Sequence, residues 1–451
     1  MRIRKVKWAN HSILGNLELN FINPITDKPY STIVLAGENG TGKTTILETL
    51  NTFLSIGSFE PFDVIEYEVE DKRYILTPST IPGSNKTFFT RYDVENDLFE
   101  NINTDKVNRP NSIQSDGKDP RSYGSVFSRP RADYKTSKIE YVKTNELDKN
   151  KYDSDNDDNF TSLKQLIVDV QNQDNEQYRD INYERDQQGQ LPLSVTDFEP
   201  MSKIYRFKSA FNGFFETLKY KKVGNASGEK VVFFEKDGKE IPLDFLSTGE
   251  KQIVFRGAYL LKDINVLRNS TIMIDEPELS MHPLWQKRIL EYYKKLFTDA
   301  NSNQIVQLFF ASHSEAVIRE ALQDLDETKV IILKRDDNKQ VSANCIGTPA
   351  ALPYTMAAEV NYQAFGLLST DYHNALYGYI EAEGWKSSFD SQYSKISYLK
   401  ERNGSTINLQ ITLTEKIRHI IHHPENRHNS YTEEDLKESI ERMRSYILSS
   451  R

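Results

Sequence analysis

Residues 1–80 carry short apolar runs between polar turns, a pattern that predicts strands. The runs at 3–8, 17–21 and 32–36 are predicted strands, whereas residues 45–53 have the character of a helix. Two alternating segments follow, at 64–67 and 73–77, and together they predict an antiparallel sheet.

Residues from about 80 to 205 differ from the flanking sequence because they are rich in Asn, Asp, Gln and Ser. Within them, residues 145–159 are acidic and poor in apolar side chains, so we predict a mobile loop that buries too little surface to order itself. Residues 162–170 and 201–220 carry the apolar spacing of helices. The segment therefore reads as a helical and disordered insertion.

The second half of the chain alternates strands and helices. Residues 231–240 contain the turn sequence Lys236-Asp237-Gly238-Lys239 between two strand-like runs. Helices are predicted at 253–261 and 315–322, and strands at 271–274, 305–310 and 329–333, which indicates an α/β fold with a core sheet closing near residue 347. Residues 348–451 predict a small, mainly helical C-terminal domain, with helices at 357–365, 372–383, 413–421 and 433–448.

A glycine-rich loop lies between the predicted strand 32–36 and the predicted helix 45–53. Its glycines let backbone N–H groups close around phosphate oxygens, and the positive end of the following helix adds to the attraction. Lys43 would reach the β- and γ-phosphates, and the Thr44 hydroxyl would ligate Mg²⁺. We therefore predict ATP and Mg²⁺ as cofactors, with these residues binding the nucleotide: Gly37, Glu38, Asn39, Gly40, Thr41, Gly42, Lys43, Thr44 and Thr45.

The predicted strand 271–274 ends in the acidic sequence Asp275-Glu276-Pro277-Glu278. Asp275, at the strand tip beside the phosphate loop, is expected to hold Mg²⁺ through water, and Glu276 is placed to polarise the attacking water. Pro277 ends the strand because it lacks a backbone donor. Glu276 and Lys43 are thus predicted catalytic residues.

Residues 246–252, Leu-Ser-Thr-Gly-Glu-Lys-Gln, form a serine–glycine turn at the start of a predicted helix. Such a turn is an anion site built from a hydroxyl, backbone N–H groups and the helix dipole. At this point the chain resembles the ABC-type ATPases, and more closely their SMC-like, RecF-like and OLD-like branch. The resemblance implies a P-loop ATPase head with a mixed sheet, in which Ser247 and Gly249 of one subunit contact the γ-phosphate held by another. A head-to-head dimer, or a higher even oligomer, is then required.

Two further segments follow in the order typical of that family. Residues 278–283 resemble the D-loop, and residues 311–314 resemble the switch-histidine segment, in which His313 would sense the γ-phosphate. The head would span residues 1–347, with halves 1–80 and 205–347 around the insertion 80–205, and residues 348–451 would form an interaction domain. No sustained heptads separate Lys43 from Ser247, which excludes the long-armed coiled-coil members.

The composition limits the partners. A net charge of −9, from 57 basic and 66 acidic residues, argues against nucleic-acid binding by the surface as a whole. The single cysteine, Cys345, fits a reducing compartment, and the sequence shows neither a signal peptide nor an apolar run of membrane length. We expect a cytoplasmic protein with no membrane partner.

Basic and aromatic residues alternate between residues 121 and 141. Such mixing can bind single-stranded nucleic acid, but it also occurs in an ordinary exposed hairpin. We favour the hairpin and keep nucleic acid as an open partner. The residues are Arg121, Tyr123, Phe127, Arg129, Arg131, Tyr134, Lys135, Lys138 and Tyr141.

The C-terminal domain offers one candidate nuclease site. A Toprim nuclease is rejected, because no Asp-x-Asp pair follows Glu381 and Glu383. Arg418 and His423 fit R-x-x-x-x-H, which resembles the motif of HEPN-type ribonucleases, where a histidine acts on the 2′-OH and an arginine stabilises the phosphorane. The competing interpretation, which we prefer, is a helix end whose cations suit the C-terminal dipole.

As a whole, the chain resembles ATPase subunits of bacterial anti-phage systems of the Septu type (PtuA-like, including retron-associated forms), with the PARIS ATPase as a near competitor. The resemblance rests on residues 1–50 and 240–335. It implies a sensor and scaffold that controls a separate nuclease, HNH-type in Septu. Two alternatives stay open: an ATP-gated HEPN-like ribonuclease and a RecF-like DNA-repair ATPase.

Overall fold

The computed structural model divides the chain into two compact units, Met1–Asn344 and Cys345–Arg451. Each unit buries an apolar cluster of its own. The structure describes residues 1–56, 59–79, 88–103, 124–130, 152–154, 163–226, 228–262, 269–299, 303–345, 351–402 and 405–450.

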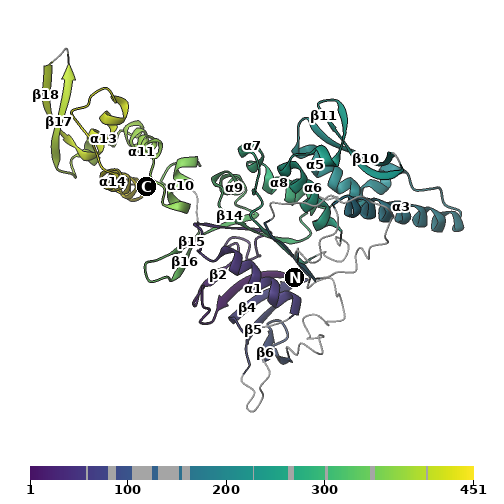
Figure 1. The fold of residues 1–451 in the computed structure, drawn as a ribbon. Helices are drawn as coiled ribbons and strands as arrows, with labels where there is room; N and C mark the ends of the chain where they lie inside the picture. Colours follow the sequence, from purple (N-terminus) through teal and green to yellow (C-terminus); the bar gives the residue numbers. More distant parts are fainter. Residues whose placement is uncertain are drawn as a thin grey trace. The chain divides into compact units, whose positions relative to one another are not determined.

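The first unit is built on a seven-stranded sheet of order β16-β15-β3-β14-β13-β8-β9 (Figure 1). The pairs β15–β3, β3–β14, β14–β13, β13–β8 and β8–β9 are parallel. β16 follows β15 through a short turn, in which Asp336 N donates to Gln340 O at 3.0 Å, and it runs back along β15. The sheet is therefore mixed, as predicted. The strands are β3 (Thr32–Gly37), β8 (Ser125–Ser128), β9 (Tyr152–Ser154), β13 (Thr271–Asp275), β14 (Gln307–Ser312), β15 (Thr328–Arg335) and β16 (Val341–Cys345).

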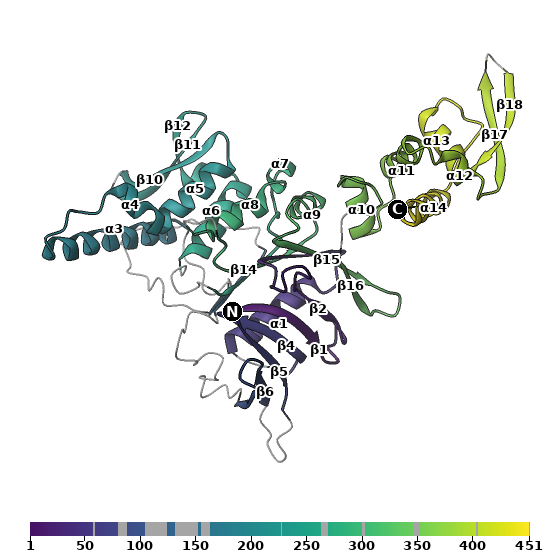
Figure 2. The same ribbon diagram turned by 180° about the vertical axis from the view of Figure 1, so that it is seen from behind.

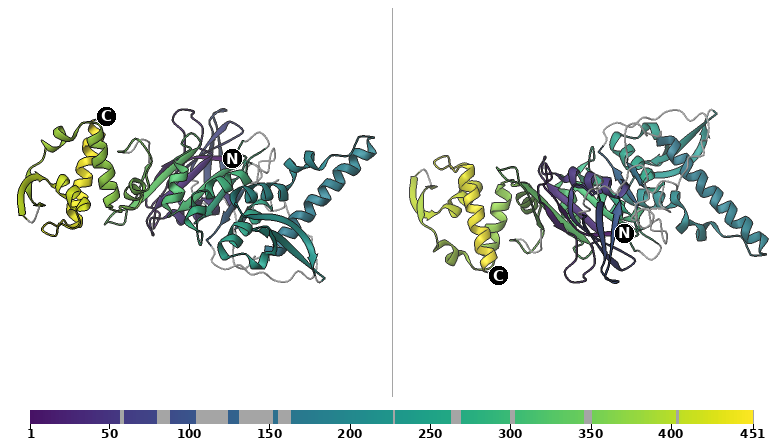
Figure 3. Two further views of the ribbon diagram at one scale, coloured as in Figure 1. Left: turned by 90° about the horizontal axis from the view of Figure 1, so that it is seen from above. Right: turned by 90° about the horizontal axis from the view of Figure 1, so that it is seen from below.

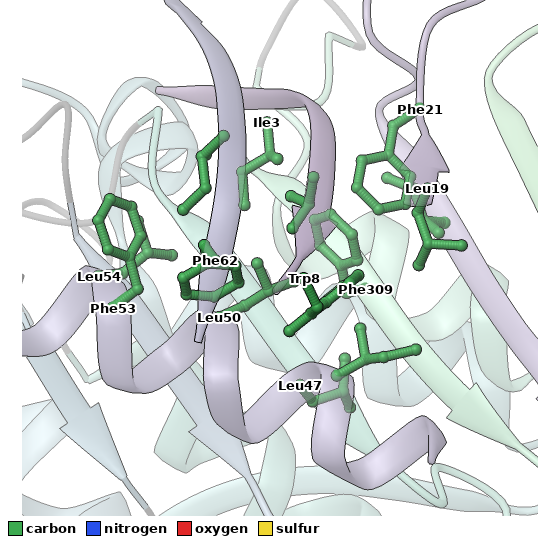
Figure 4. Packing of buried hydrophobic residues seen from close by; sticks show 14 of the residues in the cluster. Ile3, Trp8, Leu19, Phe21, Leu47, Leu50, Phe53, Leu54, Phe62 and Phe309 are labelled. Carbon is green, nitrogen blue, oxygen red and sulfur yellow. The ribbon is translucent and has the colours of Figure 1, made fainter. Parts of the chain in front are cut away.

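Helix α1 (Lys43–Ile56) packs between this sheet and a second, antiparallel sheet. Its apolar residues recur at helical spacing, and Figure 4 shows Leu47 and Leu50 packed beneath Trp8. The Trp8 ring lies 5.7 Å from that of Phe62, and burying each such side chain stabilises the fold by about 2 kcal/mol. This core fixes the start of α1, where the phosphate loop ends.

The second sheet has the order β2-β1-β4-β5-β6-β7, seen from behind in Figure 2. The predicted antiparallel pairing of 64–67 with 73–77 is confirmed, since Tyr67 lies opposite Tyr74. The strands are β1 (Arg2–Trp8), β2 (Glu18–Asn20), β4 (Phe62–Val69), β5 (Lys72–Pro78), β6 (Phe88–Asp93) and β7 (Leu98–Asn103).

Two expectations for the insertion are wrong. The basic–aromatic segment is not an exposed hairpin where it is described: Ser125–Ser128 forms β8, which lies between β13 and β9, and Phe127 is fully buried. Residues 152–154 form β9 inside the predicted loop 145–159. The rest of that loop lies outside the described residues, as do Arg121, Tyr123, Arg131, Tyr134, Lys135, Lys138 and Tyr141.

A helical layer begins within the insertion and continues after it. α3 (Leu163–Gln187) runs beside α5 (Lys203–Phe214) and α6 (Thr248–Leu261), and both views of Figure 3 show its second half extending past them. The helix predicted at 201–220 ends early, because Leu218–Ala226 forms β10 and pairs with β11 (Glu229–Lys236). Tyr220 was counted as part of the apolar pattern of the helix, but it lies in β10 and packs against Phe207 of α5. The predicted turn leads from β11 to β12 (Lys239–Pro242).

The second unit carries the four predicted helices, as α10 (Ala357–Phe365), α11 (Thr370–Ala382), α13 (Leu413–His422) and α14 (Glu433–Ser449). Sequence patterning missed an antiparallel hairpin of β17 (Lys395–Arg402) and β18 (Ser405–Thr412), and the short helix α12 (Lys386–Asp390). Ile407, Leu409 and Ile411 do alternate with polar residues, a strand pattern that the sequence analysis did not use, although most of β18 is exposed.

Candidate nucleotide site

The phosphate loop connects β3 to α1 at the carboxyl edge of the central sheet, the edge where ligands bind in open α/β folds. Gly37 cannot be replaced, because a Cβ there would lie 2.3 Å from the carbonyl oxygen of Leu333 on β15. Gly42 has a φ of +91° and packs against Leu14. Glu38, Asn39 and Gly40 at the loop tip are exposed.

Lys43 is the first residue of α1, and its side chain is curled into the loop. Its Nζ donates to Gly37 O at 2.9 Å and to Glu38 O at 2.8 Å, and the residue is only 4% exposed. Burial lowers the pKa of Lys43 to about 8, against the attraction of Asp275 and the neighbouring acids. A triphosphate in the loop would offer this ammonium oxygens with full negative charge in place of two carbonyls.

Thr44 and Asp275 meet in the position expected for a metal site. The Thr44 hydroxyl donates to Asp275 Oδ2 at 2.8 Å, and burial raises the pKa of Asp275. Hydroxyl, carboxylate and water oxygens are the ligands that Mg²⁺ takes beside nucleotide phosphates. The two side chains could therefore hold Mg²⁺, which would supply charge neutralisation at the phosphates.

The acids after β13 have different surroundings. Glu276 adopts a left-handed backbone with φ of 44°, and its N–H donates to Ala311 O at 2.9 Å. Glu278 is buried and accepts bonds at 2.8 Å from Ser312 Oγ and from the backbone N–H of His313, while burial raises the pKa of Glu278. Sequence reasoning placed Glu278 only in the D-loop and missed this contact.

His313 follows β14 and joins the same group of residues. Its Nδ1 lies 3.4 Å from Lys43 Nζ, and burial together with the nearby ammonium lowers the pKa of His313. A neutral imidazole at this place can respond to added negative charge beside Lys43. The structure thus brings Lys43, Thr44, Asp275 and His313 together.

Ser247 and Gly249 lie at the start of α6. Ser247 caps the helix in a capping box with Glu250. The Glu250 carboxylate also accepts a hydrogen bond from Lys236 Nζ at 2.8 Å. A Cβ on Gly249 would lie 2.7 Å from Ser280 O, so the turn is fitted against the D-loop. Ser247 is exposed, and among the described residues neither Ser247 nor Gly249 hydrogen-bonds to the phosphate loop of its own chain.

Arg256 was missed by sequence reasoning. It is fully buried on α6 and donates to the carbonyl oxygens of Asp275 and Glu276, both at 3.0 Å. The only signal in the sequence is a charge within the apolar run 253–261, which by itself does not indicate burial.

The C-terminal pair is not joined in the structure. Arg418 donates to Asn374 Oδ1 at 2.9 Å and also contacts His422. His423 is 55% exposed and pairs with Glu425 at 3.0 Å, and the described contacts include none between Arg418 and His423. A ribonuclease site at these residues stays a prediction.

Comparison with known proteins gives the family. Residues 33–319, well over half of the chain, match the family described as "AAA domain, putative AbiEii toxin, Type IV TA system". The chain belongs to this family. It is therefore an ATPase, and the predicted α/β P-loop ATPase head is confirmed. ATPases of this kind bind ATP, typically with Mg²⁺. No curated protein matches the sequence.

Solved structures with similar folds include SMC heads. An SmcHead bound to the C-winged helix domain of ScpA has 12% identity and a TM-score of 0.42, covering 78% of this chain and 100% of that one. The SMC head domain from Thermotoga maritima has 14% identity and a TM-score of 0.36, covering 77% and 100%. The recombination mediator RecF-ATPrS has 14% identity and a TM-score of 0.30, covering 76% and 98%.

Every helix in the part of the chain that the structure describes is too short or too polar to cross a bilayer.

Proposed function

We propose that this ATPase is the sensor and scaffold subunit of a bacterial anti-phage complex, in which two heads close on ATP and control a separate nuclease of HNH or similar type. Lys43 and Mg²⁺, held at Thr44 and Asp275, would neutralise the phosphates, Glu276 would orient the attacking water and His313 would sense the γ-phosphate. The protein would act in the cytoplasm.

The observation that carries the paired-head proposal is the distribution of the site over two separate places. Four residues meet at the phosphate loop, whereas Ser247 is held rigidly by its capping box and faces solvent. Phe245, two residues before it, is 74% exposed, and Leu284, beside the Trp285 ring that packs on Gly249, is 61% exposed. Apolar side chains exposed around an anion-binding turn favour a surface that a second copy covers when ATP is bound.

Mass in solution tests the pairing. Light scattering is measured on the full chain without nucleotide, with ATP and Mg²⁺, and with a non-hydrolysable analogue. We expect nucleotide to shift the mass from monomer to dimer. A protein that binds the analogue and keeps its mass would contradict the proposal.

Control of a nuclease is tested with the protein encoded by the neighbouring gene. We expect the two proteins to co-purify and DNA or RNA cleavage to depend on the nucleotide state of the ATPase. If the purified ATPase alone binds duplex DNA in an ATP-dependent and steeply salt-dependent way, and ignores the neighbour, the RecF-like function takes its place.

A further inference from the structure

Arg256 links three segments that are distant in the sequence. It lies on α6, nine residues after Ser247, and is 0% exposed. Its Nη2 donates to Asp275 O at 3.0 Å and to Arg129 O at 2.9 Å, and its Nη1 donates to Glu276 O at 3.0 Å. One guanidinium thus holds the end of β13 and the end of β8 against the helix.

The three hydrogen bonds of Arg256 are strong because their donor is charged. A buried charge is costly, and it is retained where several charge-assisted hydrogen bonds satisfy it. The planar guanidinium presents donors in a fixed fork, so it can hold adjacent carbonyls of one strand end at the same time. A lysine ammonium has neither the fork nor the reach.

The peptide that Arg256 holds is a strained one. Glu276 has φ of 44°, a region that a residue with a Cβ enters only where its surroundings impose it, at a cost of about 1–3 kcal/mol. Its N–H is fixed by Ala311 O at 2.9 Å and its carbonyl by Arg256 at 3.0 Å. With both sides of the residue held, the direction of the Glu276 side chain is set by β14 on one side and by α6 on the other.

The helix that carries Arg256 is itself well anchored. The capping box fixes its first turn, and the hydroxyl of Tyr292, on α8 (Ile289–Leu296), donates to Ile253 O at 2.9 Å. Between Ser247 and Arg256 the helix spans about 14 Å at 1.5 Å per residue. The segment from the cap to Arg256 is therefore held as one rigid unit, in which Ser247 and the guanidinium keep a fixed relation to each other.

We propose that Arg256 is a positioning residue for ATP hydrolysis: it sets the backbone of Glu276 and ties it to the helix that begins at Ser247. Docking of Ser247 on a partner's nucleotide then adjusts the water-orienting carboxylate of the same chain, so the two sites of a dimer act together. The inference rests on the proposed paired-head function.

Arg256→Lys tests this role in the full-length protein. We expect kcat per bound ATP to fall by at least about tenfold, since the two carbonyls of 275 and 276 can no longer be held together. ATP affinity should stay within about twofold of wild type, because the phosphate loop is untouched. Arg206→Lys is the matched control: it also replaces a guanidinium that donates to a backbone carbonyl, Thr298 O at 2.7 Å, but it lies on α5 outside the proposed linkage, so kcat per bound ATP should stay unchanged.

Hydrogen exchange covers the case of a poorly folding variant. Arg256→Gln is the second variant, and in either one residues 275–279 should lose protection while residues 43–56 keep theirs. If neither variant folds, wild type is compared with Ser247→Arg in the presence of the analogue, and the additional protection of residues 275–279 that accompanies dimer formation should require Ser247.

Three outcomes separate this inference from the proposed function. Arg256→Lys turning over bound ATP at the wild-type rate overturns the role of Arg256 alone, and so does equal protection of residues 275–279 in wild type and Ser247→Arg. A wild-type protein that never forms a nucleotide-dependent dimer overturns the paired-head function as well.

Discussion

The hydroxyl of Thr44 donates to Asp275 Oδ2 at 2.8 Å, which joins the start of α1 to the end of β13. These two residues lie 231 positions apart in the sequence, on opposite sides of the insertion. These two side chains are the ones that would hold Mg²⁺, which would supply charge neutralisation at the phosphates.

Thr44→Ala should therefore weaken ATP binding only when Mg²⁺ is present. We expect the affinity measured with Mg²⁺ to fall by about tenfold or more and the affinity measured in EDTA to stay near wild type. Thr44→Ser keeps the hydroxyl and serves as the matched control. Titration with a fluorescent ATP analogue checks this, and equal losses with and without Mg²⁺ would argue that Thr44 acts on folding instead.

Glu276→Gln should trap an ATP-bound dimer, because the amide keeps the size of the side chain but cannot polarise water. Turnover is expected to fall by at least about a hundredfold. Wild-type hydrolysis by Glu276→Gln would show that another group is the base.

Lys43→Ala should abolish nucleotide binding, since the only ammonium inside the loop is lost from the described site.

Phe245→Asp and Leu284→Asp should prevent the nucleotide-dependent dimer while each monomer still binds ATP. Both side chains are more than half exposed, so the substitutions leave the core intact, and a carboxylate at the centre of an interface is unfavourable. Leu191→Asp is the matched control, because Leu191 is 83% exposed in the turn after α3. Light scattering with the analogue measures all three, and an unchanged dimer in the first two would place the interface elsewhere.

The second unit should lose stability in acid because of His373. This imidazole is fully buried beside Ser439, at 3.0 Å from its Oγ, and burial lowers the pKa of His373 to about 4. Below pH 6.5, the ordinary pKa of histidine, this side chain binds a proton in the unfolded chain but stays neutral in the folded one. The free energy of unfolding that it contributes is therefore fully present only above that pH. It falls as the pH drops toward 4, by up to about 3 kcal/mol.

Exchange protection of α11 and α14, compared between pH 7 and pH 4.5, measures this effect. His373→Gln keeps a donor for Ser439 but does not titrate, so its loss of protection should be much smaller. A variant that loses protection in acid as the wild type does would assign the acid sensitivity to other groups.

The phosphate loop and its strands could be predicted because their signals are local. Gly37, Lys43 and Thr44 lie within one short segment, and the apolar strand before it and the helix after it confirm the context. The helices of the second unit could be predicted for the same reason, since each carries its own apolar face.

Arg256, Glu278 and β8 could not be predicted, because tertiary contacts decide their roles. The burial of Arg256 is compensated by carbonyls that lie 19 to 127 residues away in the sequence. The strand at 125–128 is short, and the basic and aromatic residues around it in the sequence are of types that usually lie on the surface. Sequence spacing does not report a charge whose partners are backbone atoms.

β8 has a consequence for how the insertion works. β8 belongs to the polar insertion that divides the ATPase, yet it pairs in parallel with β13 in the central sheet, with Ile274 opposite Ser128. Deleting residues 80–205 would remove the strand that pairs with one edge of β13, and the backbone N–H and C=O groups on that edge would lose their partners. A shortened insertion would therefore have to keep residues 125–128 in order to preserve the strand that carries Asp275.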